Sequence, residues 1–172
     1  MRDYYSSCDT SGYPSSVHYL SQFLSNHSNH PGDLSVDADA LRREPRERRS
    51  ALVVDDVADV TEMLAVVLTH AGYSVVTAAS APDALKAARE RQFDVIISDI
   101  GMPEMDGFEL RRLALAERPE LPVILVTGRP ELRAQDSSNI EPDRYFEKPF
   151  DGRQLLAAVR AALGSARPKG EA

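Results

Sequence analysis

Runs of aliphatic residues from position 51 onward alternate with longer segments in which apolar residues recur at helical spacing. The clearest run, at 95–97, has no polar residue at alternate positions, which is typical of a strand buried on both faces of a parallel sheet. Further strands are predicted at 51–54, 74–78, 123–127 and 145–147. This alternation predicts an α/β domain with helices on both faces of a parallel sheet.

Two of the predicted helices have end signals in the sequence. The first covers about 59–71 and is predicted to end at Gly72, because glycine readily adopts the left-handed conformation that terminates helices. The last is predicted to begin after Asp151, a helix-capping residue, and to end at Gly164. Their core-facing residues are predicted to be Val60, Met63, Leu64, Val67, Leu68, Ala71, Leu155, Val159 and Ala162.

Two more helices are predicted from a repeated capping pattern. Ser80 is followed three residues later by Asp83, and Asp106 is followed three residues later by Glu109. In this pattern the first side chain accepts a hydrogen bond from an N–H group that the helix leaves unpaired. The core-facing residues of these helices are predicted to be Ala84, Leu85, Ala88, Leu110, Leu113 and Ala114.

The segment 128–144 predicts only a weak helix. Pro130 can begin a helix, but the polar residues at 136–139 favour turns and Pro142 prevents continuation. We expect one or two helical turns and then a mobile loop. Partners would therefore contact mainly the last helix and the loops near Asp99, and dimerisation through this segment should be weak or absent.

The first 50 residues differ in composition from the rest. They are rich in Ser, Asn, His, Asp and Arg and lack aliphatic periodicity, so we expect most of 1–50 to be disordered. A short docking helix at 17–24 is an alternative for part of it. His27 and His30 lack further metal ligands, and acidic residues interrupt the arginines of 42–49, which favours a solvated linker over a binding arm. The domain is predicted to cover 51–164 and to be followed by a tail, 165–172.

Composition narrows the class of protein. The chain has 172 residues, a formal net charge of −7 and 42% hydrophobic residues. The negative charge argues against general binding to nucleic acid, and no apolar stretch approaches the ~20 residues of a membrane span. Cys8 is the single cysteine, and the sequence shows no secretory signal. We expect a cytoplasmic protein without membrane insertion.

Candidate chemistry lies where the predicted strands end. Asp55 and Asp56 follow the first strand and Asp99 follows the apolar run at 95–97. Thr127 ends the fourth strand, and Lys148 follows the fifth. Because the carboxyl ends of parallel strands meet at one edge of a sheet, these side chains are expected to lie close together.

The order of these residues resembles the receiver domain of two-component response regulators over residues 51–163. The matching features are the acid pair, the single aspartate, the threonine and the Lys148–Pro149 pair. The resemblance implies a flavodoxin-like, doubly wound, five-stranded sheet in the order 2-1-3-4-5. That order places Asp55, Asp56 and Asp99 at the switch point between the first and third strands.

Three neighbouring carboxylates repel one another, and a hard divalent cation with oxygen ligands relieves the repulsion. The resemblance implies that Asp56, Asp99 and the backbone carbonyl of Gly101 bind Mg²⁺ directly, and that Asp55 holds it through water. The family usually has a larger residue in place of Gly101. We therefore expect the site to be more open to solvent here.

The resemblance also implies that Asp99 is the phosphoacceptor. Lys148 and Thr127 would contact the transferred phosphoryl group, and Tyr145 would be an aromatic switch that responds to Thr127. The donor would be a phosphohistidine on a histidine kinase or a histidine phosphotransfer protein. The family has a cis peptide bond at Lys148–Pro149, whereas the general preference for such bonds is trans.

Three functions remain open from the sequence. The favoured one is a single-domain response regulator, a monomer or weak dimer that switches its binding to a downstream protein and is not an enzyme for another substrate. A phosphatase using an aspartyl phosphate is a second, although those enzymes carry Asp-x-Asp where this chain has adjacent Asp55 and Asp56. A degenerate receiver serving as a constitutive scaffold is the third, and the presence of Asp99, Thr127 and Lys148 argues against it.

Overall fold

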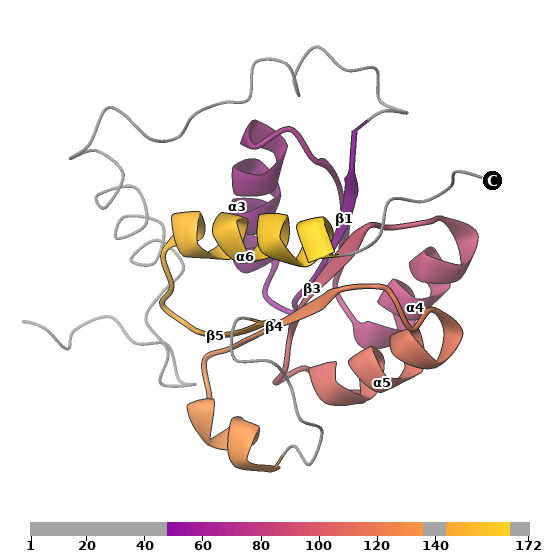
Figure 1. The fold of residues 1–172 in the computed structure, drawn as a ribbon. Helices are drawn as coiled ribbons and strands as arrows, with labels where there is room; N and C mark the ends of the chain where they lie inside the picture. Colours follow the sequence, from indigo (N-terminus) through magenta and orange to yellow (C-terminus); the bar gives the residue numbers. More distant parts are fainter. Residues whose placement is uncertain (1–47, 136–143, 166–172) are drawn as a thin grey trace, which may run out of the picture. The chain divides into compact units, whose positions relative to one another are not determined.

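The computed structural model describes residues 48–135 and 144–165, which contain a five-stranded parallel sheet. The strand order is β2-β1-β3-β4-β5, which confirms the order that the resemblance implied. Figure 1 shows this sheet with its helices. The strands are β1 (Ser50–Val54), β2 (Ser74–Ala78), β3 (Val95–Asp99), β4 (Val123–Thr127) and β5 (Tyr145–Glu147). The predictions made for residues 1–47 and 166–172 lie outside the described residues.

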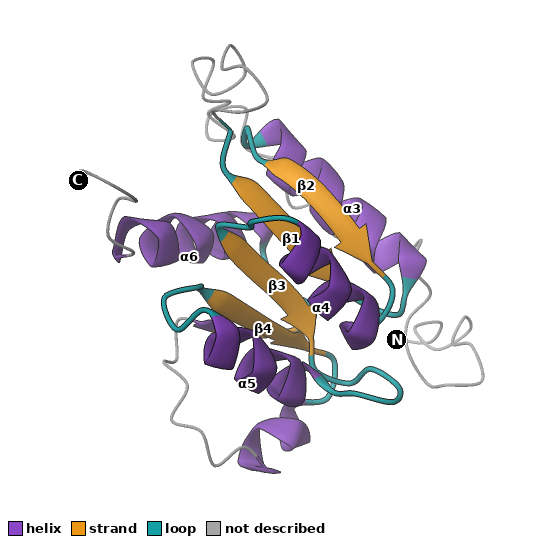
Figure 2. Ribbon diagram, turned by 90° about the vertical axis from the view of Figure 1, so that its right-hand side faces the viewer, coloured by secondary structure: helices purple, strands orange, loops and turns teal. Residues whose placement is uncertain are grey.

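Four α-helices of the described residues cover the two faces of this sheet. They are α3 (Ala58–His70), α4 (Ala81–Glu90), α5 (Gly107–Glu117) and α6 (Gly152–Ser165). Helices α4 and α5 lie in front of the strands in Figure 2, whereas α3 and α6 lie behind them. The doubly wound α/β arrangement predicted from the sequence is therefore confirmed.

The predicted helix starts agree with the structure. The hydroxyl of Ser80 accepts a hydrogen bond from the Asp83 N–H at 3.2 Å, and the carboxylate of Asp106 accepts one from the Glu109 N–H at 2.8 Å. After α3, Gly72 has a φ of 90°, the left-handed conformation that only glycine adopts without cost.

The predicted end of the last helix at Gly164 is wrong, because α6 continues to Ser165. A glycine in a helix costs only about 1 kcal/mol relative to alanine, which the packing of the rest of the helix outweighs. Leu155 and Val159 supply that packing, since both are fully buried. Gly164 itself faces open space, where an added Cβ would meet no other atom within 4 Å.

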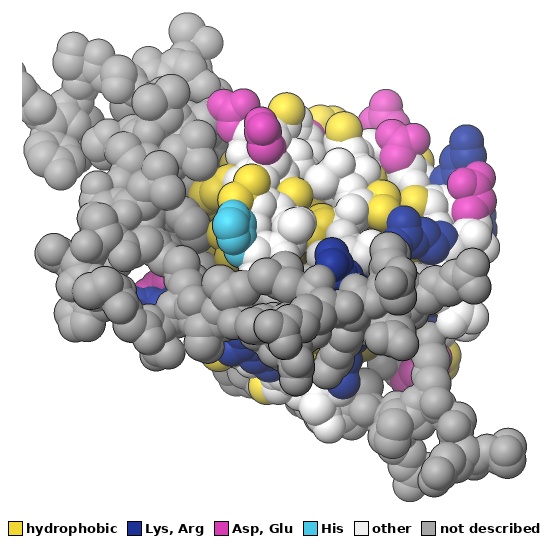
Figure 3. Space-filling model, turned by 90° about the horizontal axis from the view of Figure 1, so that it is seen from above, with side chains coloured by type: hydrophobic (Ala, Val, Ile, Leu, Met, Phe, Trp, Pro, Cys, Tyr) yellow, Lys and Arg dark blue, Asp and Glu magenta, His cyan; other side chains and the backbone are white. Residues whose placement is uncertain are grey.

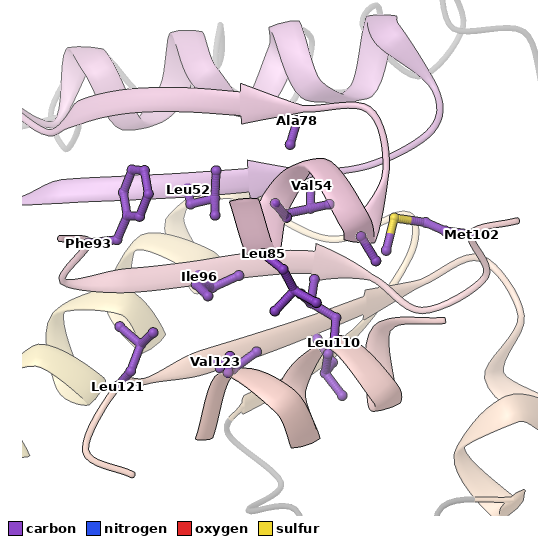
Figure 4. Close-up of a cluster of buried hydrophobic side chains, with 14 of the residues drawn as sticks. Leu52, Val54, Ala78, Leu85, Phe93, Ile96, Met102, Leu110, Leu121 and Val123 are labelled. Carbon is purple, nitrogen blue, oxygen red and sulfur yellow. The ribbon is translucent and has the colours of Figure 1, made fainter. Parts of the chain in front are cut away.

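One hydrophobic core lies between the sheet and the helices α4 and α5 (Figure 4). Leu52 and Ile96 from the strands meet Leu85 and Leu110 from these helices, and Phe93 closes one end of the cluster. All five residues of β3 are buried, as the uninterrupted apolar run predicted. This burial holds the carboxyl ends of β1 and β3 next to each other.

The region after β4 contains a short 3-10 helix, η1, at Pro130–Gln135. Six residues of 3-10 helix make about two turns, so the predicted short helix is present. The loop predicted after it, at 136–143, lies outside the described residues.

The face of the molecule drawn in Figure 3 carries both acidic and basic side chains. On the face drawn in Figure 3, acidic and basic side chains are interspersed with hydrophobic ones among the residues the structure describes. Within those residues, no helix is both long enough and apolar enough to cross a membrane.

Candidate functional site

The carboxyl edge of the sheet gathers most of the residues that the sequence singled out. Asp55 directly follows β1, Asp99 is the last residue of β3 and Thr127 is the last residue of β4. Lys148 follows β5 by one position. The strands run parallel and in register, with Val54 beside Ser98 and Asp99 beside Val126, so their ends reach the same level.

Lys148 joins the two buried carboxylates. Its ammonium donates hydrogen bonds to Oδ2 of Asp55 at 2.5 Å and to Oδ1 of Asp99 at 2.7 Å. The lysine side chain is only 16% exposed, and those of Asp55 and Asp99 are 2% and 9% exposed. One cation thus neutralises part of the charge of two carboxylates that are shielded from water.

The electrostatics of this cluster follow from burial first. Burial raises the pKa of Asp55, the charge and hydrogen bond of Lys148 lower it, and the nearby Asp99 raises it again, so that the pKa is raised on balance. Burial alone would lower the pKa of Lys148, but attraction to Asp55 and Asp99 outweighs it, and the pKa is raised. The ammonium is therefore protonated at neutral pH.

Backbone groups hold the other oxygen of each carboxylate. The Val57 N–H donates to Oδ1 of Asp55 at 2.9 Å, and the Gly101 N–H donates to Oδ2 of Asp99 at 2.6 Å. Lys148 is anchored at its own N–H, which donates to the carbonyl of Thr127 at 2.7 Å, and the Lys148–Pro149 peptide bond is cis. Both carboxylates are thus oriented before any ligand arrives.

Thr127 and Tyr145 are buried on the neighbouring strands β4 and β5, and the Thr127 hydroxyl does not bond to the acidic cluster. The Thr127 hydroxyl accepts a hydrogen bond from the Arg129 N–H at 2.9 Å and donates one to the Arg129 carbonyl at 3.2 Å. Tyr145, at the start of β5, is 7% exposed and belongs to the hydrophobic core. The hydroxyl of Thr127 is thus engaged with its own loop.

Asp56 is the predicted ligand that stands apart from the others. Its side chain is exposed, and no hydrogen bond or ion pair connects it with another residue in the described ranges. The sequence pattern places it beside Asp55, but the end of β1 turns one carboxylate inward and leaves the other in solvent.

Arg129 is a site residue that the sequence reasoning missed. Its Nη2 donates a hydrogen bond of 2.9 Å to the carbonyl of Gly101, the predicted main-chain metal ligand. A Cβ at position 101 would lie 2.3 Å from that nitrogen. The expectation that Gly101 opens the site to solvent therefore needs correction, since the guanidinium fills the space that a side chain would take. Two features of the sequence could have indicated this contact. Gly101 has no side chain and Arg129 has a long cationic one, and each lies two positions after the last residue of a strand.

The donor set suits a hydrated Mg²⁺ ion. Within the described residues, no three His, Cys, Asp or Glu side chains are arranged to hold a metal. The cluster instead offers two buried carboxylates, Asp55 and Asp99, and the carbonyl of Gly101, the residue whose N–H is bonded to Asp99. Mg²⁺ takes oxygen ligands, often only one or two carboxylates, and keeps several waters.

Comparison with known proteins gives a single family. The model of the response regulator receiver domain matches residues 51–160. The probable transcriptional regulatory protein TcrX of Mycobacterium tuberculosis is 31% identical over 124 residues, which are 72% of this chain and 53% of TcrX. The transcriptional regulatory protein AfsQ1 of Streptomyces coelicolor is 37% identical over 115 residues, 66% of this chain and 51% of AfsQ1. The chain spans about half the length of these relatives.

Solved structures show the same fold. A CheY-like receiver domain protein from Methanospirillum hungatei is 28% identical with a TM-score of 0.61, and the match covers 72% of this chain and 99% of that one. The response regulator TrrA of Thermotoga maritima, solved in complex with Mg²⁺-BeF, is 27% identical with a TM-score of 0.59. That match covers 66% of this chain and 98% of TrrA. With the family model covering most of the chain and the strand order and buried cluster as described, the chain belongs to the response regulator receiver domain family.

Proposed function

We propose that this domain accepts a phosphoryl group on Asp99 in a Mg²⁺-dependent reaction and thereby changes its binding to a partner protein. The observation that carries the proposal is the Lys148 ammonium, which contacts Asp55 and Asp99 together at the carboxyl edge of the sheet. It gives the acceptor carboxylate a buried, charge-compensated place in which to react.

The transfer needs positioning more than covalent activation. An oxygen of Asp99 attacks the phosphorus of a phosphohistidine, a P–O bond forms, and the P–N bond breaks. The imidazole nitrogen leaves with the electron pair of that bond and takes up a proton. The product is an acyl phosphate on Asp99. Lys148 then has a phosphoryl oxygen within reach of its ammonium in place of the Asp99 oxygen that it now contacts.

Mg²⁺, when bound, would neutralise the charge that gathers on the phosphoryl oxygens. Asp56, Asp99 and the carbonyl of Gly101 would hold it, with Asp55 acting through water. The buried oxygens of Asp55 and Asp99 support this assignment. The exposed Asp56 has to turn toward the cluster to take part.

Thr127 and Tyr145 would transmit the effect of phosphorylation from the site to the surface that a partner binds. The Thr127 hydroxyl contacts the backbone of Arg129, and it would give up these bonds to donate to a phosphoryl oxygen. Tyr145 lies beside Leu125 in the sheet, two positions before Thr127 in the neighbouring strand. A change at Thr127 would therefore be transmitted to the edge strand β5.

The donor we propose is a phosphohistidine on a histidine kinase or a histidine phosphotransfer protein, and the downstream target is a protein. Action as a single-domain regulator stays a prediction, because the named relatives are transcriptional regulators and the chain spans about half their length. Its cytoplasmic location and its monomeric or weakly dimeric state are predictions as well.

Acetyl phosphate labelling tests the proposal. Incubation with acetyl phosphate and Mg²⁺ should add one phosphoryl group to the wild type, measured as intact mass, and borohydride trapping should place it on Asp99. Asp99→Asn should take up none, and omission of Mg²⁺ should greatly slow the labelling. An unlabelled wild type that binds partners as Asp99→Asn does would favour the constitutive scaffold. Repeated turnover of p-nitrophenyl phosphate would favour a phosphatase.

A further inference from the structure

The guanidinium of Arg129 is hydrogen-bonded to the carbonyl oxygen of Gly101, an atom that the proposed function assigns to the metal. Its Nη2 donates to the Gly101 carbonyl at 2.9 Å, and the Gly101 N–H donates in turn to Asp99 at 2.6 Å. A cation of the protein is thus bonded to the residue that links the loop after β3 with the phosphoacceptor carboxylate. A hydrogen bond from a charged donor to a carbonyl is stronger than a neutral one.

The absence of a side chain at position 101 makes this contact possible. A Cβ there would lie 2.3 Å from Nη2, 3.0 Å from Cζ and 3.0 Å from Nε of Arg129. All three close atoms belong to the flexible end of one side chain, and none belongs to the backbone. Any residue other than glycine would therefore move the guanidinium and leave the backbone in place.

The backbone of Arg129 is anchored as well. Its N–H and its carbonyl are both hydrogen-bonded to the Thr127 hydroxyl, at 2.9 and 3.2 Å, and its carbonyl also accepts from the Leu132 N–H at 3.0 Å. The side chain therefore starts from a fixed point at the end of β4. Its contact with Gly101 bridges the loops that follow β3 and β4.

We infer that Arg129 competes with the divalent cation for the Gly101 carbonyl, so that the metal binds only when the guanidinium leaves. This inference rests on the proposed function, because it uses Gly101 as a metal ligand. The two cations compete in two ways: they need the same carbonyl oxygen, and their positive charges repel when both are near Asp99. Arg129 itself is exposed, so the guanidinium can move into water without a large penalty.

Because competition between two cations is reciprocal, it can be measured both through the affinity for Mg²⁺ and through the response of Arg129 to Mg²⁺. If Arg129 must leave before Mg²⁺ binds, a protein without this contact binds Mg²⁺ more tightly. Although the donor is charged, the bond is exposed to water, so we expect the net worth of an ordinary hydrogen bond, about 0.5 to 1.5 kcal/mol, which corresponds to a gain in affinity of about twofold to tenfold. Mg²⁺ should also change the surroundings of the Arg129 side chain in the wild type.

Two single substitutions distinguish competition for the Gly101 carbonyl from repulsion by the positive charge of Arg129. Arg129→Met removes both the contact and the charge, whereas Gly101→Ala keeps the charge and removes only the contact. Arg89→Met is the matched control, because Arg89 pairs with Glu117 near the ends of α4 and α5 and its loss changes the net charge equally. Melting without Mg²⁺ shows that each variant is folded.

The experiment is a titration with MgCl₂ alone, followed by the amide signals of Asp99 and Gly101 and by the Nε–H signal of Arg129. We expect tighter binding by about twofold to tenfold in both Arg129→Met and Gly101→Ala, no change in Arg89→Met, and no further gain in the double variant over Arg129→Met. The Arg129 Nε–H signal should shift with Mg²⁺ in the wild type.

Two results would overturn the inference: an unchanged Mg²⁺ affinity in Gly101→Ala, or an Arg129 signal that Mg²⁺ leaves in place. Failure of the proposed metal site looks different. In that case neither the wild type nor any variant would show a Mg²⁺-dependent shift, or Asp99→Asn would bind the ion as well as the wild type does.

Discussion

The ammonium of Lys148 lies 2.5 Å from Oδ2 of Asp55, although 93 positions separate the two residues in the chain. The sheet order places β3 and β4 between the strands that these residues follow, so the lysine side chain reaches across the ends of both. This contact ties the edge strand β5 to the centre of the sheet. Among the described residues, Lys148 is the cation that pairs with the buried carboxylate of Asp55.

Lys148→Met should lower the free energy of unfolding by about 3 kcal/mol, because it leaves Asp55 and Asp99 buried without their cation. Methionine keeps most of the apolar stem, so the loss reports the charge and not the packing. Urea denaturation in metal-free buffer measures it. Lys86→Met on the exposed face of α4 is the control and should change stability by less than about 0.5 kcal/mol. A similar small change in Lys148→Met would contradict the prediction.

Gly107→Ala and Gly164→Ala should have opposite effects. A Cβ at Gly107 would lie 2.3 Å from the carbonyl oxygen of Asp99 and 2.9 Å from Cα of Ile100, both backbone atoms that cannot move without disturbing β3. We expect Gly107→Ala to cost about 2 to 3 kcal/mol. Gly164 lies in α6 with open space around it, so alanine there should add about 0.5 kcal/mol. Thermal melts of the two variants measure both changes in stability, and destabilisation by Gly164→Ala would contradict the prediction.

Tyr73 should make the fold sensitive to alkaline pH. Burial raises the pKa of its phenol, and the nearby Asp94 adds to this, whereas Arg160 and Arg49 oppose it. Between the unfolded pKa of about 10 and the raised folded value, the folded state keeps a proton that the unfolded state has lost. The free energy of unfolding therefore falls as pH rises through this window.

Tyr73→Phe lacks that proton and keeps the ring. Urea denaturation at about pH 8 and about pH 11 should show a larger loss of stability in the wild type than in Tyr73→Phe. The alkaline titration of Lys148 is common to both proteins and cancels in the comparison. Equal losses would show that Tyr73 titrates alike in the folded and unfolded states.

Ser80→Ala should lower the free energy of unfolding by about 1 kcal/mol, because it removes the acceptor for the Asp83 N–H at the start of α4. The same hydroxyl also donates to the Asp83 carboxylate at 2.7 Å. Ser80→Asn is the matched control, since asparagine caps helices about as well as serine does and its amide can donate to the Asp83 carboxylate. Chemical denaturation should rank alanine below both, and an asparagine variant as unstable as the alanine variant would refute the capping role.

Local sequence patterns were sufficient for much of the fold. The uninterrupted run at 95–97, the capping pairs at Ser80 and Asp106, and the glycine after α3 each act over a few residues, so the chain shows them directly. The likeness to receiver domains supplied the strand order. Gly164 shows the limit of such signals, because a single propensity of about 1 kcal/mol does not end a helix whose Leu155 and Val159 are well packed.

Patterns along the chain were enough to identify the residues at the strand ends: Asp55, Asp99, Thr127 and Lys148. The partners of these residues could not be identified in this way, because they depend on the folded arrangement. In the folded chain Asp55 is buried, whereas Asp56 is exposed. Lys148 donates hydrogen bonds to both Asp55 and Asp99, and Arg129 donates one to the carbonyl of Gly101. The physical reason is that a strand pattern specifies which residue lies at an edge, whereas hydrogen bonds form between side chains that packing brings together from distant parts of the chain.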